Sequence, residues 1–283
     1  MKLTRAKVLE LLRRKNDGWS SYRLRKQFGI SERRVNQLWQ IYLASGEVPL
    51  VGRRLGRPRR PPTSSERRLV LEAYERFRVS ASLLEPLLRR AYGRHVPHNR
   101  IHPILVEAKL ATPGETMIRK KAWIRYERRY SLSAVHMDWH EHRRGIWVCA
   151  VLDDASRFVL AVVETSSPTT EASISVLAQA LRKGRIREVI TDHGSQFTTN
   201  RDGESRFEEY LKAHKIRHIL CRIKHPQSNG KMERWFQTYK KHRDAFPTLE
   251  KFLHWYNAVK PHLSLNFEKL ETPKQAFARK MRP

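Results

Sequence analysis

Three closely spaced β-strands are predicted by residues 134–165, which read AVHMDWHEHRRGIWVCAVLDDASRFVLAVVET. Three segments, 134–140, 145–153 and 158–164, are rich in Val, Ile, Phe and Trp, and short polar turns separate them. Such runs are typical of strands, and connections of hairpin length make consecutive strands antiparallel. The stretch therefore predicts three consecutive antiparallel strands.

The residues that follow alternate between helical and strand patterns. A helix is predicted from Ser167-Pro168 to Gly184, because proline is favoured at the first position of a helix and glycine at its C-terminal cap. The other predicted elements are strands at 187–191 and 217–221 and helices at 206–214, 229–243 and 249–259. The order βββ-α-β-α-β-α is that of the ribonuclease H-like fold, an α/β fold in which helices flank a mixed sheet.

Three carboxylates stand at positions that this fold brings together. Asp138 lies in the first strand, Asp192 directly follows the fourth strand, and Glu233 lies in the first turns of a long helix. Converging carboxylates repel one another and raise one another's pKa, which a hard divalent ion such as Mg²⁺ or Mn²⁺ would relieve. Two such ions, about 3.5–4 Å apart, can activate a water or 3′-hydroxyl and stabilise the leaving oxygen of a phosphodiester.

Each carboxylate also has a structural interpretation. Asp138 could be the buried partner of an arginine, Asp192 could cap a turn, and Glu233 could pair with a cation on its own helix. Taken together, the three favour a catalytic site. Asp153 and Asp154 are the competing candidates for the catalytic carboxylates. We interpret them as hairpin residues, with Arg157 as a possible partner.

The charge of the chain indicates a polyanionic partner. Among 283 residues, 57 Lys and Arg stand against 28 Asp and Glu, a net charge of +29. Such an excess favours contact with nucleic acid, since cations that meet phosphates release condensed counterions; a soluble, self-repelling protein is the alternative. Cys149 and Cys221 form no CxxC pair, so neither a zinc site nor a disulfide framework is predicted. Apolar runs are too short to span a membrane, and a cytosolic protein acting on the chromosome or an episome is expected.

Residues 4–46 predict three short helices in a helix-turn-helix pattern. Thr4 and Ser31 are expected N-caps, Gly29 is expected at the turn, and Tyr22 is expected among the apolar positions of the second helix. The alternative is a three-helix bundle with a solvated basic face. The exposed side of the third helix is expected to contact base edges and phosphates, through Arg33, Arg34, Gln37 and Gln40.

Basic linkers separate the remaining parts. The first, 51–63, carries Arg57 and Arg59, and its Gly56-Arg57-Pro58 core resembles the AT-hook of minor-groove binding proteins; a plain basic linker is the alternative. Residues 64–111 predict a second, less clear helix-turn-helix unit with helices at 66–77, 81–92 and 99–110. A second basic linker follows at 112–130.

The chain resembles the DDE transposases and integrases of the retroviral-integrase superfamily, in particular prokaryotic insertion-sequence transposases. The motifs that carry the resemblance are Arg125-Tyr-Glu-Arg-Arg-Tyr130 before Val135-His-Met-Asp138, Leu152-Asp-Asp-Ala-Ser-Arg157, Thr191-Asp-His-Gly-Ser-Gln-Phe197, His225-Pro-Gln-Ser-Asn-Gly-Lys-Met-Glu233, Tyr256-Asn257, Pro261-His262 and Thr272-Pro273.

The resemblance implies that Asp138, Asp192 and Glu233 bind the metal ions. It also implies that Asn229 and Gly230 shape a loop gripping DNA, and contacts to DNA are expected from Lys231 and Arg234 in the same stretch. The chain departs from the family in one spacing: Glu233 follows Asp192 by 41 positions, which is longer than usual for the family. It also lacks the HHCC zinc module of retroviral relatives.

The resulting prediction is a DNA transposase or integrase that binds terminal inverted repeats, cleaves 3′ ends and joins them to target DNA, working as at least a dimer. The alternatives are a metal-dependent nuclease of the same fold and a non-catalytic DNA-binding regulator. The predicted organisation is a helix-turn-helix domain at 1–50, a linker at 51–63, a helical domain at 64–111, a linker at 112–130, the catalytic core at 131–262 and a tail at 263–283.

Overall fold

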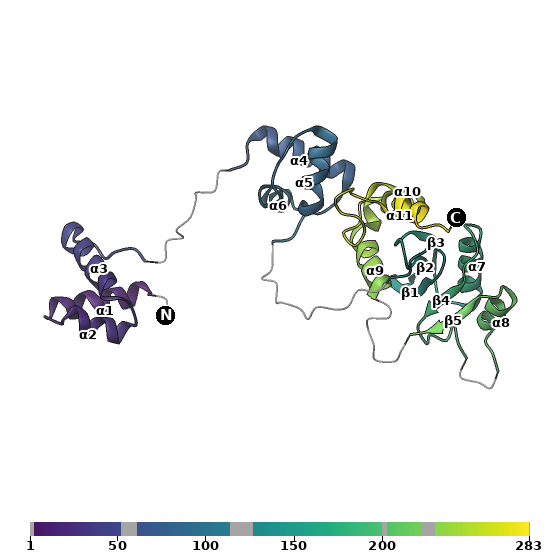
Figure 1. Cartoon of the computed structure of the whole chain (residues 1–283), viewed down its shortest axis with the longest axis horizontal. Helices are drawn as coiled ribbons and strands as arrows, with labels where there is room; N and C mark the ends of the chain where they lie inside the picture. The colour runs from purple at the N-terminus through teal and green to yellow at the C-terminus, as the bar shows by residue number, and fades with distance from the viewer. Residues whose placement is uncertain (1–2, 52–60, 114–126, 200–202, 222–229, 283) are drawn as a thin grey trace. The chain divides into compact units, whose positions relative to one another are not determined.

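The computed structural model describes residues 3–51, 61–113, 127–199, 203–221 and 230–282 (Figure 1). The chain divides into two compact units, Met1–Pro61 and Pro62–Pro283. The first unit is helical and has its own hydrophobic core. The second unit contains further helices and a β-sheet.

The helices of the first unit are α1 (Arg5–Asn16), α2 (Ser21–Phe28) and α3 (Glu32–Ser45). They begin as predicted, because Thr4, Ser20 and Ser31 each accept a hydrogen bond from a backbone N–H in the first turn. Gly29 adopts a φ of 61° between α2 and α3, a conformation that glycine reaches without steric cost. The prediction for Tyr22 was wrong: its side chain is 52% exposed, because Leu24 and Phe28 alone carry α2 into the core.

The second unit begins with α4 (Ser64–Phe77), α5 (Ala81–Tyr92) and α6 (His98–Glu107). Their apolar faces form one core, which also includes Leu270 from the C-terminal region. The indole Nε1 of Trp255 donates a buried hydrogen bond of 2.7 Å to the carbonyl oxygen of Phe77. These helices are therefore attached to the C-terminal part of the chain.

The strands form one mixed sheet of five strands in the order β3-β2-β1-β4-β5. Strand β1 pairs antiparallel with β2 and parallel with β4, β2 pairs antiparallel with β3, and β4 pairs parallel with β5. The sheet and its topology confirm the predicted ribonuclease H-like fold. The strands are β1 (Val135–Arg143), β2 (Ile146–Asp153), β3 (Val159–Thr165), β4 (Glu188–Thr191) and β5 (Arg217–Leu220).

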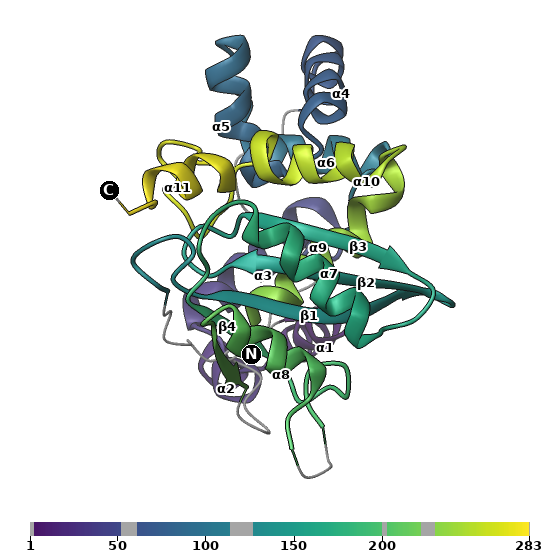
Figure 2. The same ribbon diagram turned by 90° about the vertical axis from the view of Figure 1, so that its right-hand side faces the viewer.

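Helices cover both faces of the sheet (Figure 2). Helices α7 (Thr170–Leu181) and α8 (Arg206–Ala213) share a core with Met137 and Trp139 of β1. Helix α9 (Gly230–His242) shares a second core with Val148 and Ala150 of β2 on the other face. Because side chains alternate along a strand, the even-numbered residues of β1 lie on the face that carries α9.

The predicted ends of α7 were wrong at both sides. Pro168 precedes the helix, which begins after Thr169 because the Thr169 side chain accepts a hydrogen bond from the Ala172 N–H. The helix ends before Gly184, whose φ is 143°. A Cβ at Gly184 would lie 2.6 Å from Cδ1 of Leu132, so close packing and backbone conformation account for this glycine.

The C-terminal residues complete the second unit. Helix α10 (Leu249–His254) continues into a π-helical turn, Trp255–Val259, and α11 (Pro273–Arg279) lies in the segment predicted as a tail. The backbone N–H of Ser131 donates to the carbonyl of Lys280 at 2.9 Å, which attaches the end of the chain to the start of the sheet. In the part of the chain that the structure describes, no helix has the length and apolar character needed to cross a bilayer.

Candidate active site

Asp138 and Asp192 lie at neighbouring positions of two parallel strands. The register between β1 and β4 pairs Val135 with Val189 and His136 with Ile190. Continued by two residues, to the position directly after β4, the same register brings Asp138 beside Asp192. Both side chains are half-buried, so each carboxylate is supported by the sheet and still reachable from solvent.

Backbone N–H groups orient both carboxylates. Oδ1 of Asp138 accepts a hydrogen bond of 2.8 Å from the Trp139 N–H, and Oδ1 of Asp192 accepts one of 3.0 Å from the Gly194 N–H. Asp192 therefore does cap the turn after β4, as its structural interpretation expected. A carboxylate has about four lone-pair sites, so a cap and a metal ligand are compatible roles for one side chain.

The negative charges of Asp138 and Asp192 both affect the pKa of a nearby thiol, that of Cys221. Cys221 directly follows β5, and its N–H donates to the Thr191 carbonyl at 2.8 Å. The pKa of the Cys221 thiol is raised to about 11, first by burial and then by the negative charges of Asp138 and Asp192. Both carboxylates therefore lie close enough to the Cys221 thiol, at the end of β5, to affect its pKa.

Two contacts hold α9 along β1. At the start of the helix, Lys231 binds the carboxylate of Asp154, which also accepts a hydrogen bond of 2.7 Å from Nε2 of His136. Further along, the ring of Phe236 packs against that of His140, with centroids 4.9 Å apart. The helix therefore runs in the same direction as the strand.

Asp138 and Glu233 both lie in the stretches of β1 and α9 that these two contacts join. Asp138 is the residue of β1 between the two contacting histidines on the same face, and Glu233 lies between the two contacting residues of α9. The Glu233 side chain is exposed and lies in the first turn of the helix, where the positive end of the helix dipole stabilises a carboxylate.

The three carboxylates offer the oxygen donors that Mg²⁺ and Mn²⁺ prefer. Within the described residues, no group of three or more His, Cys, Asp or Glu side chains is close enough together to hold a metal ion. Glu233 therefore does not form a three-carboxylate cluster with Asp138 and Asp192. The fit to a divalent ion rests on the donor chemistry of these side chains and on the register of β1 and β4.

A buried polar network beside the site was not predicted. Asp154 has no exposed surface, and besides Lys231 and His136 it accepts a hydrogen bond of 2.7 Å from the Arg128 N–H. Burial would raise the pKa of Asp154, but the hydrogen bond from His136 and the charge of Lys231 outweigh it and hold the pKa below its ordinary value. Burial lowers the pKa of His136, which donates to Asp154 as a neutral ring. The network fixes the start of α9 to the sheet.

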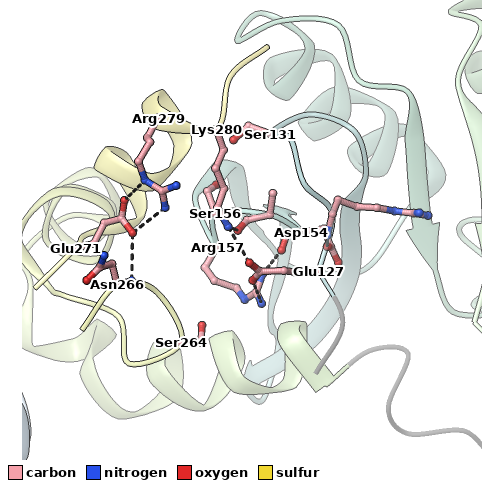
Figure 3. Close-up of polar contacts among 12 residues, drawn as sticks. Glu127, Ser131, Asp154, Ser156, Arg157, Ser264, Asn266, Glu271, Arg279 and Lys280 are labelled. Carbon is pink, nitrogen blue, oxygen red and sulfur yellow. Dashed lines mark hydrogen bonds and ion pairs between the residues drawn. The ribbon is translucent and has the colours of Figure 1, made fainter. Parts of the chain in front are cut away.

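The hairpin after β2 has the structural role that was predicted for Asp153 and Asp154. Asp153 accepts hydrogen bonds from the Leu132 and Ser156 N–H groups at 2.8 and 2.9 Å. Arg157 does contact both aspartates, but through the backbone: its N–H donates to the Asp153 carbonyl and its guanidinium to the Asp154 carbonyl, and the guanidinium lies 3.3 Å from the Glu127 carboxylate (Figure 3). Glu127, just before the sheet, forms the ion pair with Arg157, because the carboxylates of Asp153 and Asp154 already accept other hydrogen bonds.

Asn257 of the C-terminal signature binds the sheet, and Glu271, next to that signature, binds Arg279 of the last helix. The side-chain amide of Asn257 accepts from the Val159 N–H and donates to the Val159 carbonyl, both at 3.0 Å. Glu271 binds Arg279 at 2.7 Å and accepts from the Asn266 N–H (Figure 3). These residues support the fold and lie outside the carboxylate site.

The predicted DNA-binding residues fall into three groups. On α3, Arg33 and Gln37 are exposed, and Nη1 of Arg34 donates to Oε1 of Gln37 at 2.6 Å. On α9, Arg234 is exposed, whereas Lys231 is engaged by Asp154. The residues that lie outside the described part of the chain are Arg57, Arg59 and Asn229.

Comparisons with known proteins point to one family. The family model of the integrase core domain matches residues 130–226. An uncharacterized protein of Archaeoglobus fulgidus is 28% identical, over 34% of this chain and 78% of its own length. The "Putative integrase ORF3" of Spiroplasma virus SpV1 is also 28% identical, over 43% of this chain; only 40% of that protein's length is matched.

Solved structures of retroviral integrases are also similar. The catalytic core domain of BIV integrase has 18% identity and a TM-score of 0.42, covering 52% of this chain and 94% of that one. The simian T-cell lymphotropic virus intasome, in complex with a PP2A regulatory subunit, has 18% identity and a TM-score of 0.45, covering 74% of each chain.

Proposed function

The chain belongs to the integrase/transposase superfamily through the integrase core domain at residues 130–226, and on that premise we propose that it is a DNA transposase or integrase. It binds the terminal inverted repeats of a mobile element, cleaves the 3′ ends and joins them to target DNA. Its substrate is double-stranded DNA of a prokaryotic chromosome or episome. The net charge of +29 supports a DNA substrate.

The observation that carries this proposal is the parallel register of β1 and β4, which supports Asp138 and Asp192 as a pair of metal ligands. Glu233, on the helix that packs along β1, is proposed as the third ligand. Bound Mg²⁺ or Mn²⁺, expected as two ions, would lower the pKa of the attacking water or 3′-hydroxyl and neutralise charge on the phosphate. The backbone N–H groups of Trp139 and Gly194 keep the carboxylates oriented.

Strand transfer with purified full-length chain tests the proposal. The substrate is a duplex ending in the inverted repeat that flanks the gene, incubated with supercoiled plasmid and Mg²⁺, and a duplex with a scrambled end is the control. Covalent joining of repeat ends to plasmid, mapped by sequencing, is expected. Cleavage without joining would instead identify a nuclease, and specific binding without either reaction would identify a regulator.

Substitutions on α3 should relax sequence preference. Arg33 and Gln37 are exposed on this helix, and the hydrogen bond from Arg34 turns the Gln37 amide N–H groups outward as donors. We expect Arg33→Ala or Gln37→Ala to reduce the preference for repeat over scrambled DNA by about 1–3 kcal/mol, the value of a base contact. Fluorescence anisotropy with both duplexes measures the difference.

Arg5→Ala is the control for this experiment, because Arg5 is an exposed cation on α1. It should weaken binding to both duplexes equally or not at all. Equal losses on both duplexes for Arg33→Ala and Gln37→Ala would show that α3 contacts only phosphates.

The first basic linker should contribute sequence-independent affinity. We expect replacement of all five arginines of 52–62 by glutamine to weaken binding to every duplex and to flatten the log–log salt plot by about 0.9 for each lost phosphate contact. The preference for repeats should persist. A lost preference with an unchanged slope would instead mean that Gly56-Arg57-Pro58 reads the minor groove.

The active complex should contain at least two chains. Two element ends must be processed together, and each chain carries one set of the three carboxylates. Mass photometry of complexes assembled on repeat duplexes should therefore give a mass of two or more chains for every pair of ends. A paired-end complex with a single chain would contradict this expectation.

A further inference from the structure

A cluster of basic side chains lines a cavity of about 1060 Å³ in the second unit. It combines residues from three segments: Arg78 directly after α4, Lys241 and His242 at the end of α9, and Lys260 after the π-helical turn. We call these four residues the cationic cluster. Lys241 is exposed and the others are half-buried, so the cluster is open to a ligand.

Aromatic rings, rather than carboxylates, are the neighbours that support the cluster. The Arg78 guanidinium lies 5.6 Å from the ring centroid of Phe246, and the Lys260 ammonium lies 5.5 Å from that of Tyr256. The ion pairs among the described residues include none of the four. Elsewhere in the same cavity, Glu127 pairs with Arg157 and Lys231 pairs with Asp154.

Burial and the neighbouring cations affect the titration of two of these side chains. The pKa of His242 is lowered to about 4, first by burial and then by the charges of Lys241, Lys260 and Arg78. Burial lowers the pKa of Lys260 to about 8. His242 is therefore neutral at pH 7, and Arg78, Lys241 and Lys260 supply a positive potential that an anion would relieve.

The backbone around the cluster is held firmly. Arg78 adopts a φ of 49°, in the left-handed region that residues with a side chain seldom occupy. The preceding residue, Phe77, is fixed because its carbonyl accepts the hydrogen bond from Trp255. The cluster is thus assembled by the attachment of α4 to the C-terminal region.

We propose that the cationic cluster binds a phosphate of the DNA backbone, so that the DNA lies across the junction between α4 and the end of α9. This inference rests on the proposed function. Helix α9 rises about 14 Å from Glu233 to His242, which equals the axial rise of about four base pairs for a duplex that lies parallel to the helix. In that orientation the cluster contacts the strand a few nucleotides from the bond that is cut.

Paired substitutions in the full-length chain test this site. Lys241→Gln with Lys260→Met removes two charges, and Met keeps the unbranched stem of Lys260. Binding to repeat and scrambled duplexes should weaken alike, roughly tenfold, with the salt slope reduced by about 0.9 for each lost contact. The melting temperature without DNA should not fall, because Lys241 is exposed and burial already disfavours the charge of Lys260. The matched control is Arg182→Gln with Lys183→Gln, two exposed cations after α7 on the other face of the sheet.

Several outcomes would overturn the assignment. Unchanged affinity and salt slope would exclude a phosphate contact, and a loss confined to the repeat duplex would indicate base reading. If inorganic phosphate alone raised the melting temperature of the wild-type chain as much as the duplex does, the site would take free phosphate. The single variant Lys241→Gln, at an exposed position, serves the same test if the double variant does not fold. If the wild-type chain joins DNA and the variants bind DNA as well as the wild type, the phosphate contact by the cluster is refuted while the proposed function stands. If the wild-type chain does not bind DNA, the proposed function itself is refuted.

Discussion

Asp138→Asn, Asp192→Asn and Glu233→Gln are each expected to abolish metal-dependent cleavage and joining while DNA binding persists. Each substitution removes one negative charge at nearly constant shape. Metal-ion stabilisation of the transition state is worth several kcal/mol, so loss of a ligand should slow both reactions by roughly three orders of magnitude. The rates are measured with a pre-cut and an uncut repeat duplex in Mg²⁺.

Glu209→Gln is the matched control for the three variants, because Glu209 is an exposed carboxylate in the first turn of α8. It should retain wild-type rates. Near wild-type joining by any of the three variants would remove that residue from the site. Substitution of Asp153 or Asp154 would then follow, with unfolding measured in parallel because both residues are buried.

Asp154→Ala is expected to lower the free energy of unfolding by about 3–5 kcal/mol, the cost of removing one partner from a buried ion pair. The variant deprives the Lys231 ammonium of this carboxylate, and it removes the acceptor for the His136 ring and the Arg128 N–H. Urea denaturation followed by tryptophan fluorescence measures the change.

A double-mutant cycle separates the ion pair from the other contacts of Asp154. Asp154→Asn, Lys231→Met and the combined variant are compared, and the combined loss should be smaller than the sum of the single losses. Residues that interact directly show coupling of roughly 0.5–3 kcal/mol in such cycles. Strict additivity would mean that the pair does not hold α9 on the sheet.

The positions of the strands could be predicted from the sequence, because each strand is a short apolar run with clear polar boundaries. The sequence also predicted that the first and fourth strands are neighbours, which the parallel pairing of β1 and β4 confirms; the roles of Asp138 and Asp192 stay a prediction. The ends of α7 were missed because Thr169 and Pro168 are both favourable helix starts, and the choice depends on which side chain reaches a backbone N–H.

The network around Asp154 could not be predicted, for a different reason. Lys231 lies 77 positions away along the chain, and the pair forms only because α9 packs along β1. Likewise, the neighbours of Arg78 become visible only when α4 is attached through Trp255. Contacts of this kind depend on tertiary packing, and no local pattern of residues encodes them.

The side-chain amide of Asn257 has a consequence for how copies of the chain associate. Strand β3 is at the edge of the sheet, and unpaired edge strands are templates for aggregation with other molecules. At Val159 both outward backbone groups are already bound by Asn257, so a strand from another molecule has no starting point there. Asn257 therefore blocks intermolecular β-pairing at the first residue of this edge strand.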